Sequence, residues 1–105
     1  MFVVTITNVA DLNQVDHAAD KHRAWLDSHF ADGVFVAAGR RVPRSGGVII
    51  ASGVDRHELD AIVSEDPFSL AGLARYNVVE FEADRAAPEL RHLLPIAEPA
   101  GSIRH

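Results

Sequence analysis

The order in which strand-like and helix-like apolar patterns follow one another constrains the fold of this chain more than any other feature. Apolar residues that alternate with period two indicate a strand, and apolar residues that recur every three or four positions indicate a helix. These periods predict a strand over 2–8, a helix over 11–31, strands over 34–38 and 48–51, a helix between Asp55 and Asp66, and a strand over 76–81. Residues 43–47 are rich in turn-forming types, so the two short strands should form an antiparallel hairpin.

The expected helices have recognisable ends. Two pairs of side chains have the spacing of a capping box, Asp11 with Gln14 and Asp55 with Glu58. Gly33 lies where a residue in the left-handed conformation would end the first helix. Both helices are therefore predicted with defined boundaries.

This β-α-β-β-α-β order is that of the ferredoxin-like α+β fold, in which two helices cover one face of a four-stranded antiparallel sheet. A chain of 105 residues fits one such domain, which we place at residues 1–85. Residues 86–105 are punctuated by three prolines and are predicted to form an extension with one short turn around 89–94. We expect this extension to pack on the domain or on a dimer mate.

The expected strands are apolar on both of their alternating faces, although the helices can cover only one face. Val34 and Val36 alternate with Phe35, and Val48 and Ile50 alternate with Ile49. A second apolar face requires a second sheet, which a copy of the same chain can supply. The sequence therefore predicts a homodimer.

Composition excludes several classes of protein. The chain has no cysteine, so thiol catalysis, disulfides and cysteine-ligated metals are excluded. Its formal charge is −5 and its arginines form no long stripe, which argues against nucleic acid as a partner. No apolar run is long enough to cross a membrane, and no secretory leader is recognisable. We expect a cytoplasmic protein.

One histidine of the first helix lies where an apolar residue is expected. At about 100° per residue, His22 falls in the middle of the helix's apolar stripe, whereas His17 points the opposite way. The other members of that stripe are Val15, Ala18, Ala19, Leu26 and Phe30. His22 is either a core histidine that a backbone carbonyl satisfies or a residue that lines a cavity and exchanges protons.

Asp66 also has two possible roles. It precedes Pro67, which ends the second helix because a residue before proline is pushed out of the helical region. Aspartate before proline is a common helix N-cap. One carboxylate oxygen can cap a helix while the other orients an imidazole, so the structural and functional roles are compatible.

Other candidate groups carry weaker signals. Arg40, Arg41 and Arg44 cluster at the hairpin, either as a solvated turn or to bind a carboxylate or phenolate. Strand alternation lets only one of Arg40 and Arg41 point into a cleft. Ser69 near Asp66 is a further candidate for substrate binding. We expect no metal site, because no two histidines have the spacing of a metal-binding pair and no third ligand joins His57 and Asp60.

Several short motifs, taken in order, resemble the YciI-like (YCII-related) family over about residues 2–82. They are Lys21-His22-Arg23-Ala24-Trp25-Leu26, Ala37-Ala38-Gly39, Gly46-Gly47-Val48-Ile49-Ile50, and Asp66-Pro67-Phe68 with Ala71-Gly72-Leu73 after it. The resemblance implies a ferredoxin-like fold, assembly as a dimeric α/β barrel, and a site formed by His22 and Asp66. The chain departs from the family at Arg40 and Arg41, where many members have a proline after the glycine.

The known chemistries that the resemblance implies move protons without a cofactor. We therefore expect a lyase- or isomerase-type enzyme that needs no cofactor and acts on a small anionic or aromatic molecule, with His22 as general acid and base. Asp66 would fix the tautomer of His22 and stabilise the imidazolium. The alternatives are a non-catalytic ligand-binding or accessory module that uses the same cleft, and a purely structural dimer.

Overall fold

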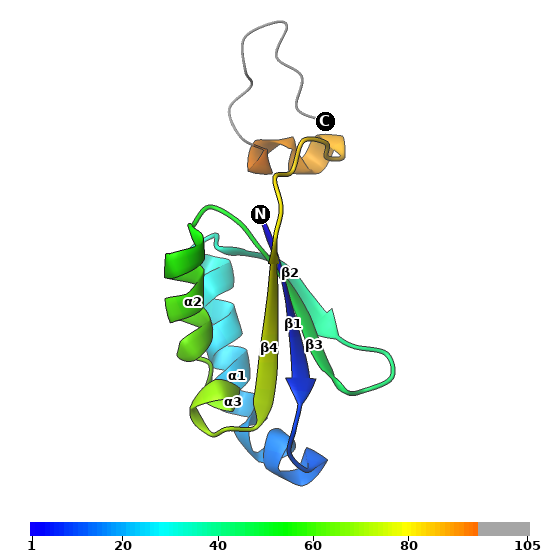
Figure 1. The fold of residues 1–105 in the computed structure, drawn as a ribbon, viewed down its shortest axis with the longest axis vertical. Helices are drawn as coiled ribbons and strands as arrows, with labels where there is room; N and C mark the ends of the chain where they lie inside the picture. Colours follow the sequence, from blue (N-terminus) through cyan, green and yellow to red (C-terminus); the bar gives the residue numbers. More distant parts are fainter. Residues whose placement is uncertain (95–105) are drawn as a thin grey trace, which may run out of the picture.

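Four antiparallel strands form one sheet in the computed structural model, which describes residues 1–94. The strands are β1 (Phe2–Asn8), β2 (Phe35–Arg40), β3 (Gly46–Ala51) and β4 (Ala74–Glu80), and their spatial order is β2-β3-β1-β4. The helices α1 (Leu12–Ala31), α2 (Arg56–Ser64) and α3 (Pro67–Leu70) lie along one face of the sheet (Figure 1). This arrangement confirms the ferredoxin-like α+β fold.

Only one of the two predicted capping boxes forms. The Asp55 side chain accepts from the Glu58 amide at 2.7 Å, and the Glu58 side chain accepts from the Asp55 amide at 3.3 Å. The box predicted at Asp11 is wrong, because its side chain makes no capping hydrogen bond. The first turn of α1 is closed by the backbone instead, with the Gln14 amide donating to the Asp11 carbonyl at 3.0 Å. The end of α1 agrees with the prediction, since Gly33 has φ of +83°.

The core lies between the helices and the inward face of the sheet. Phe2, Val4 and Ile6 alternate along β1 and are all buried, as period-two patterning requires. The same cluster contains Trp25, Phe35, Ile49, Ala51, Leu59 and Val63. Its largest members come from elements far apart in sequence, so this core holds the two halves of the chain together.

The buried face of α1 differs from the predicted stripe. Trp25 is buried, whereas Phe30 is 40% exposed. The Trp25 indole donates to the Ile62 carbonyl at 3.1 Å, so α1 packs against α2 as well as against the sheet. The predicted stripe assumes that α1 faces only the sheet, so it does not include the contact of Trp25 with α2.

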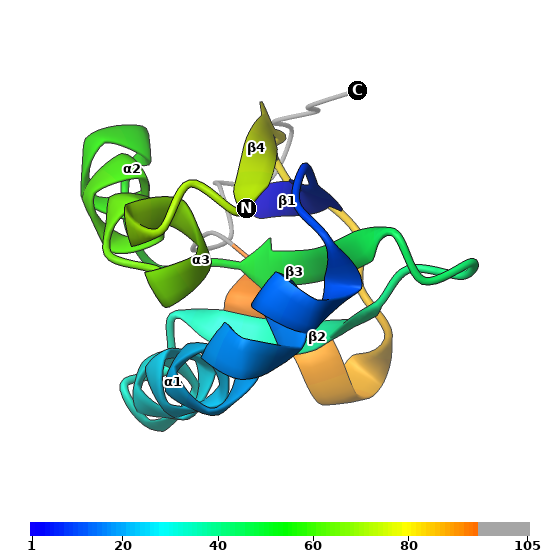
Figure 2. The same cartoon turned by 90° about the horizontal axis from the view of Figure 1, so that it is seen from below.

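The outward face of the sheet is covered by no element in residues 1–94. Val3, Val48 and Ile50 on this face are only half-buried, and Val79 is 50% exposed. Viewed end-on, the sheet is twisted and α1, α2 and α3 all lie to one side of it (Figure 2). An uncovered apolar face is the feature from which the sequence predicts a dimer.

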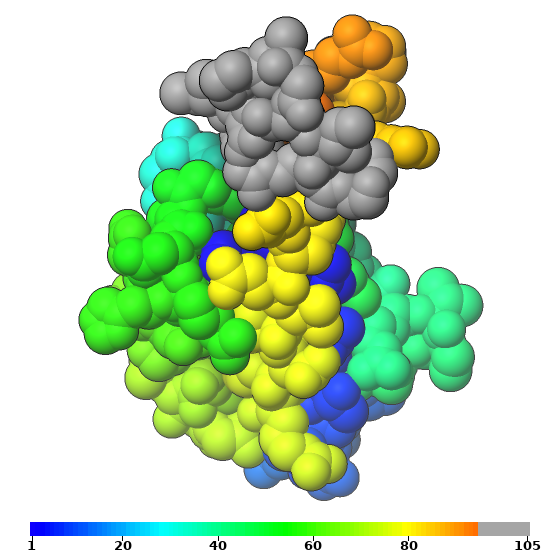
Figure 3. Space-filling model, turned by 45° about the horizontal axis from the view of Figure 1, so that its top comes forward, coloured from blue at the N-terminus to red at the C-terminus, as the bar shows by residue number. Residues whose placement is uncertain are grey.

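The connection between β2 and β3 projects from the body of the protein (Figure 3). Val42 in this loop is 97% exposed. Gly46, where β3 begins, has φ of +152°, and a Cβ atom there would lie 1.7 Å from the Ile6 carbonyl oxygen. Only glycine therefore fits where β3 passes β1 at this point.

The chain continues beyond β4 into a 3₁₀ helix, η1 (Pro88–Leu93), which confirms the predicted short turn. Figure 1 shows η1 beyond the end of the sheet, and Leu90 is 43% exposed. Packing of the extension on the domain or on a dimer mate stays a prediction, as does the domain boundary at residue 85. The last part of this extension, 95–105, lies outside the described residues.

Candidate functional site

Asp66 is a buried carboxylate that caps a helix. It precedes α3 as the N-cap, and its Oδ1 accepts a hydrogen bond from the Phe68 amide at 3.0 Å. The residue has no exposed surface. A carboxylate at this depth needs partners for both oxygens, because an unpaired buried charge is strongly unfavourable.

His22 supplies the second partner of Asp66. Its Nδ1 lies 2.7 Å from Asp66 Oδ1, although the two residues are 44 positions apart in sequence. An ionised carboxylate can only accept, so Nδ1 carries the hydrogen and Nε2 is left as the basic nitrogen of the neutral ring. The His22 side chain is 15% exposed, which makes it accessible without being solvated on all sides.

Tyr76 on β4 is the third member of this group, and sequence reasoning missed it. Its hydroxyl donates to Asp66 Oδ2 at 2.5 Å. Burial, together with the adjacent Asp66 carboxylate, raises the pKa of Tyr76 well above its usual range. One signal could have found it: Tyr76 alternates with Val78 on an inward strand face, and a buried tyrosine hydroxyl usually has a partner.

Aromatic rings hold the imidazole from the sides. The His22 and Phe68 rings are stacked with centroids 4.0 Å apart and planes inclined by 10°. The Trp25 ring lies 5.6 Å from His22. The orientation of His22 is therefore fixed by both a hydrogen bond and packing.

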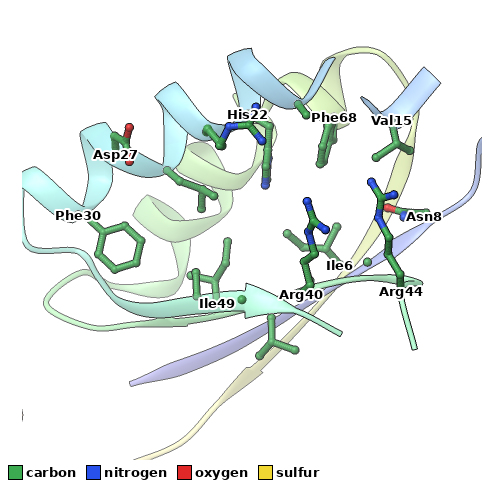
Figure 4. A pocket seen from close by; sticks show the side chains of 18 residues that line it. Ile6, Asn8, Val15, His22, Asp27, Phe30, Arg40, Arg44, Ile49 and Phe68 are labelled. Carbon is green, nitrogen blue, oxygen red and sulfur yellow. The ribbon is translucent and has the colours of Figure 1, made fainter. Parts of the chain in front are cut away.

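A pocket of about 320 Å³ opens beside His22. It lies between α1 and the inward face of β2 and β3, as Figure 4 shows. Its apolar lining includes Ile6, Val15, Leu26, Phe30, Ile49 and Phe68. Such a volume is at the small end for ligand sites, so the pocket suits a small molecule with an apolar body.

Three arginines also line the pocket, and two of them are paired. Arg23 forms an ion pair with Asp20, and Arg44 forms one with Asp16. The side chain of Arg40, the last residue of β2, has no hydrogen bond or ion pair within residues 1–94. The pocket thus has a free guanidinium at its edge.

Two of the predicted binding residues are not in the pocket lining. Arg41 donates to the Thr7 hydroxyl at 2.9 Å, on the opposite side of the sheet from Arg40, as strand alternation predicts. Ser69 follows Phe68 in α3 and does not line the pocket either. The structure therefore brings His22, Asp66 and Arg40 around one region and leaves Arg41 and Ser69 outside it.

Residues 1–94 contain no group of three histidine or acidic side chains placed to hold a metal ion. No helix in that range is long and apolar enough to span a membrane.

Comparison with known proteins identifies the family. A family model for the YCII-related domain matches residues 1–82. The chain belongs to the YCII-related family. The resemblance drawn from its short motifs is thereby confirmed, and the match ends close to the end of β4.

A solved structure shares the fold of this YCII-related protein. It is TftG, the 5-chloro-2-hydroxyhydroquinone dehydrochlorinase from Burkholderia phenoliruptrix AC1100, in complex with 2,5-dihydroxybenzoquinone. The two chains are 21% identical with a TM-score of 0.66, over 76% of this chain and 91% of TftG. No curated protein sequence matches the chain. At this level of identity the likeness establishes the fold alone.

Proposed function

We propose that this YCII-related protein is a lyase- or isomerase-type enzyme that needs no cofactor and moves a proton on a small anionic or aromatic molecule. The observation that carries the proposal is the contact of 2.7 Å between His22 Nδ1 and a fully buried Asp66, directly beside a pocket. A histidine with a fixed tautomer and one accessible nitrogen has the arrangement of a general acid and base.

The proposed step begins with removal of a proton from carbon. His22 Nε2 accepts the proton, and the electron pair of the broken C–H bond forms a carbon–carbon double bond. In an elimination, a leaving group departs with its own electron pair. In an isomerisation, an existing double bond shifts and the imidazolium returns the proton to another carbon. Neither route needs an oxidant or a reductant.

In this mechanism Asp66 stabilises the imidazolium that His22 becomes. Its Oδ1 holds the Nδ1 hydrogen, so the ring gains its charge beside a carboxylate. Tyr76 and the Phe68 amide donate to the same carboxylate and keep it in place. TftG, by its name, catalyses a dehydrochlorination, which is an elimination, and this supports the proposed class of reaction.

We also propose that the working unit is a homodimer joined through the outward face of the sheet. The support is the row of half-buried and exposed apolar side chains on that face, which no element of residues 1–94 covers. The α/β-barrel assembly predicted from the family resemblance would cover it.

A non-catalytic binding module is the second candidate. The observation that favours it is that Asp66 already has structural roles, because it caps α3 and accepts a hydrogen bond from Tyr76. These roles do not require His22 to move protons. The same pocket would then serve binding alone.

Proton transfer can be tested without knowing the natural substrate. Small carboxylates and phenols are incubated with the protein in D₂O, and proton NMR follows exchange of their carbon-bound hydrogens. We expect catalysed exchange in at least one compound, and its loss in His22→Asn. If exchange persists in His22→Asn, or if no compound exchanges although one binds in the pocket, the catalytic role is wrong and the binding module is favoured.

A further inference from the structure

Arg40 points into the pocket because of its register in the sheet. Arg40 pairs with Gly47, and Ala38 pairs with the buried Ile49, so Ala38 and Arg40 both face the helices. Gly47 has no side chain to fill the space beside Arg40. Figure 4 shows the Arg40 side chain rising from the end of β2 toward α1, the helix that carries His22.

The positive charge of Arg40 has no counterpart within the described residues, 1–94. Arg23 and Arg44 are neutralised by Asp20 and Asp16, but no carboxylate of residues 1–94 pairs with Arg40. Asp27 lines the other end of the pocket, near Phe30 (Figure 4). One unpaired cation remains at the end of the pocket where β2 stops, so the pocket is complementary to a single negative charge.

The rest of the pocket lining determines which kind of molecule can carry the negative charge that binds Arg40. Leu26 and Phe68 form one wall, and Ile6 and Ile49 form the other, so the body of a ligand between them must be apolar. A phosphate dianion would need several donors, whereas a carboxylate matches the two parallel N–H groups of one guanidinium. The volume of about 320 Å³ restricts the ligand to a compact molecule.

We propose that Arg40 binds the carboxylate of a compact monocarboxylate whose apolar body lies in the pocket beside His22. Arg40 is thus the residue that determines the charge of the substrate. The assignment of this ligand as substrate rests on the function proposed for His22, but its binding to Arg40 does not.

Benzoate is a suitable probe because it combines one carboxylate with a compact apolar ring. Calorimetric titration should show benzoate binding to the wild-type protein, and benzamide, its neutral counterpart, should bind at least about tenfold more weakly. Arg40→Gln should weaken benzoate binding by at least about tenfold, since it removes a charge-assisted hydrogen-bond pair. Arg40→Lys keeps the positive charge but lacks the two parallel N–H donors of the guanidinium, so it should have intermediate affinity for benzoate.

The neighbouring arginine provides a matched control. Arg41→Gln removes the same charge one residue away, outside the pocket lining, and should leave benzoate affinity within about twofold. Thermal melts establish that each variant is folded. Because Arg40 is exposed at the end of its strand, Arg40→Gln should fold, and Arg40→Lys tests the site if it does not.

Three results would overturn the assignment. They are the absence of benzoate binding, an unchanged affinity in Arg40→Gln, and Arg40-dependent binding of 4-nitrophenolate without binding of benzoate, which would make the ligand a phenolate. His22→Asn separates the two proposals. If benzoate still binds this variant but hydrogen exchange is absent from the wild type, the function proposed for His22 fails while the carboxylate site stands. If exchange depends on His22 but benzoate affinity is unchanged in Arg40→Gln, the carboxylate site fails while the function proposed for His22 stands.

Discussion

The imidazole of His22 is stacked on the ring of Phe68, with centroids 4.0 Å apart, and its Nδ1 is hydrogen-bonded to Asp66, which precedes Phe68 by two residues. Residues 66–68 therefore hold the His22 ring in two ways, by stacking on its face and by a hydrogen bond to its Nδ1. Pro67 between them begins α3, and the Asp66 carboxylate caps that helix through the Phe68 amide. The local structure of this turn and the geometry of the site are consequently coupled.

Replacing His22 should remove function with little loss of stability. His22→Asn retains hydrogen-bonding capacity but not the titratable ring, so we expect a decrease in unfolding free energy of at most about 1–2 kcal/mol. Turnover or pH-dependent ligand binding should be abolished. Urea denaturation and the D₂O exchange assay measure the two effects. His17→Asn, at an exposed position of the same helix, is the control. A large destabilisation with unchanged ligand binding would show that His22 is a core residue.

Replacing Asp66 with alanine should lower the unfolding free energy more than replacing it with asparagine. Asp66→Ala removes the α3 cap and leaves the hydrogens of His22 and Tyr76 without an acceptor, so we expect a loss of about 3–5 kcal/mol. Asp66→Asn keeps one acceptor oxygen and should cost about 1–2 kcal/mol. Both should lose activity, because neither can stabilise an imidazolium. Equal stability of the two variants in urea denaturation would contradict the network described for this carboxylate.

Tyr76 should make the protein sensitive to high pH. Its pKa is raised in the folded state, so the unfolded chain loses this proton at a lower pH than the folded chain does. The stability from Tyr76 is thus complete below its ordinary pKa of about 10 and declines as the pH rises above it. Tyr76→Phe should be less stable at neutral pH by about 1–3 kcal/mol, because Asp66 Oδ2 loses its donor.

The two proteins should therefore converge in stability as the solution becomes alkaline. Denaturation of both at several pH values from about 8 to about 11 measures this. Since Tyr76 is the single tyrosine of the chain, tyrosinate absorbance follows its ionisation directly. Ionisation of Tyr76 near its ordinary pKa in the folded protein would contradict the buried contact with Asp66.

The outward face of the sheet should control assembly. Sedimentation at micromolar concentration should give twice the 11.4 kDa mass of one chain. Val79→Lys places an unpaired charge on this face and should raise the dimer dissociation constant at least about tenfold. Val42→Lys makes the same change at a residue that is 97% exposed and should have no effect. A stable wild-type monomer would rule out the barrel assembly, whereas a tetramer would not.

The fold, and two residues of the candidate site, could be predicted from the sequence because they depend on local patterns. Strand alternation, the box at Asp55 and the Asp66-Pro67 pair each act within a few residues, and each formed as expected. His22 was recognisable because a polar residue interrupts an apolar stripe. The contact of 2.7 Å between His22 and Asp66 joins the two residues that the family resemblance implies as a site.

The sequence could not show contacts that depend on how the elements pack. Trp25 is buried because α2 supplies a carbonyl for its indole, and this partner lies 37 positions away. Alternation along β4 indicates that Tyr76 faces inward, but its contact with Asp66 depends on how α3 packs against β4. Asp11 has the spacing of a capping residue, yet the backbone closes that turn without its side chain.

The glycine at the start of β3 limits how this pocket can be altered. With a Cβ at Gly46 only 1.7 Å from the Ile6 carbonyl oxygen, a saturation library at this position should return glycine alone among folded variants. Gly39 and Gly47 likewise present backbone rather than side chains to the pocket. Ile6, Ile49 and Phe68 of the lining are buried core residues. Changes in ligand preference, whether in nature or by engineering, are therefore expected at lining side chains outside the core, such as Leu26, Phe30 and Arg40.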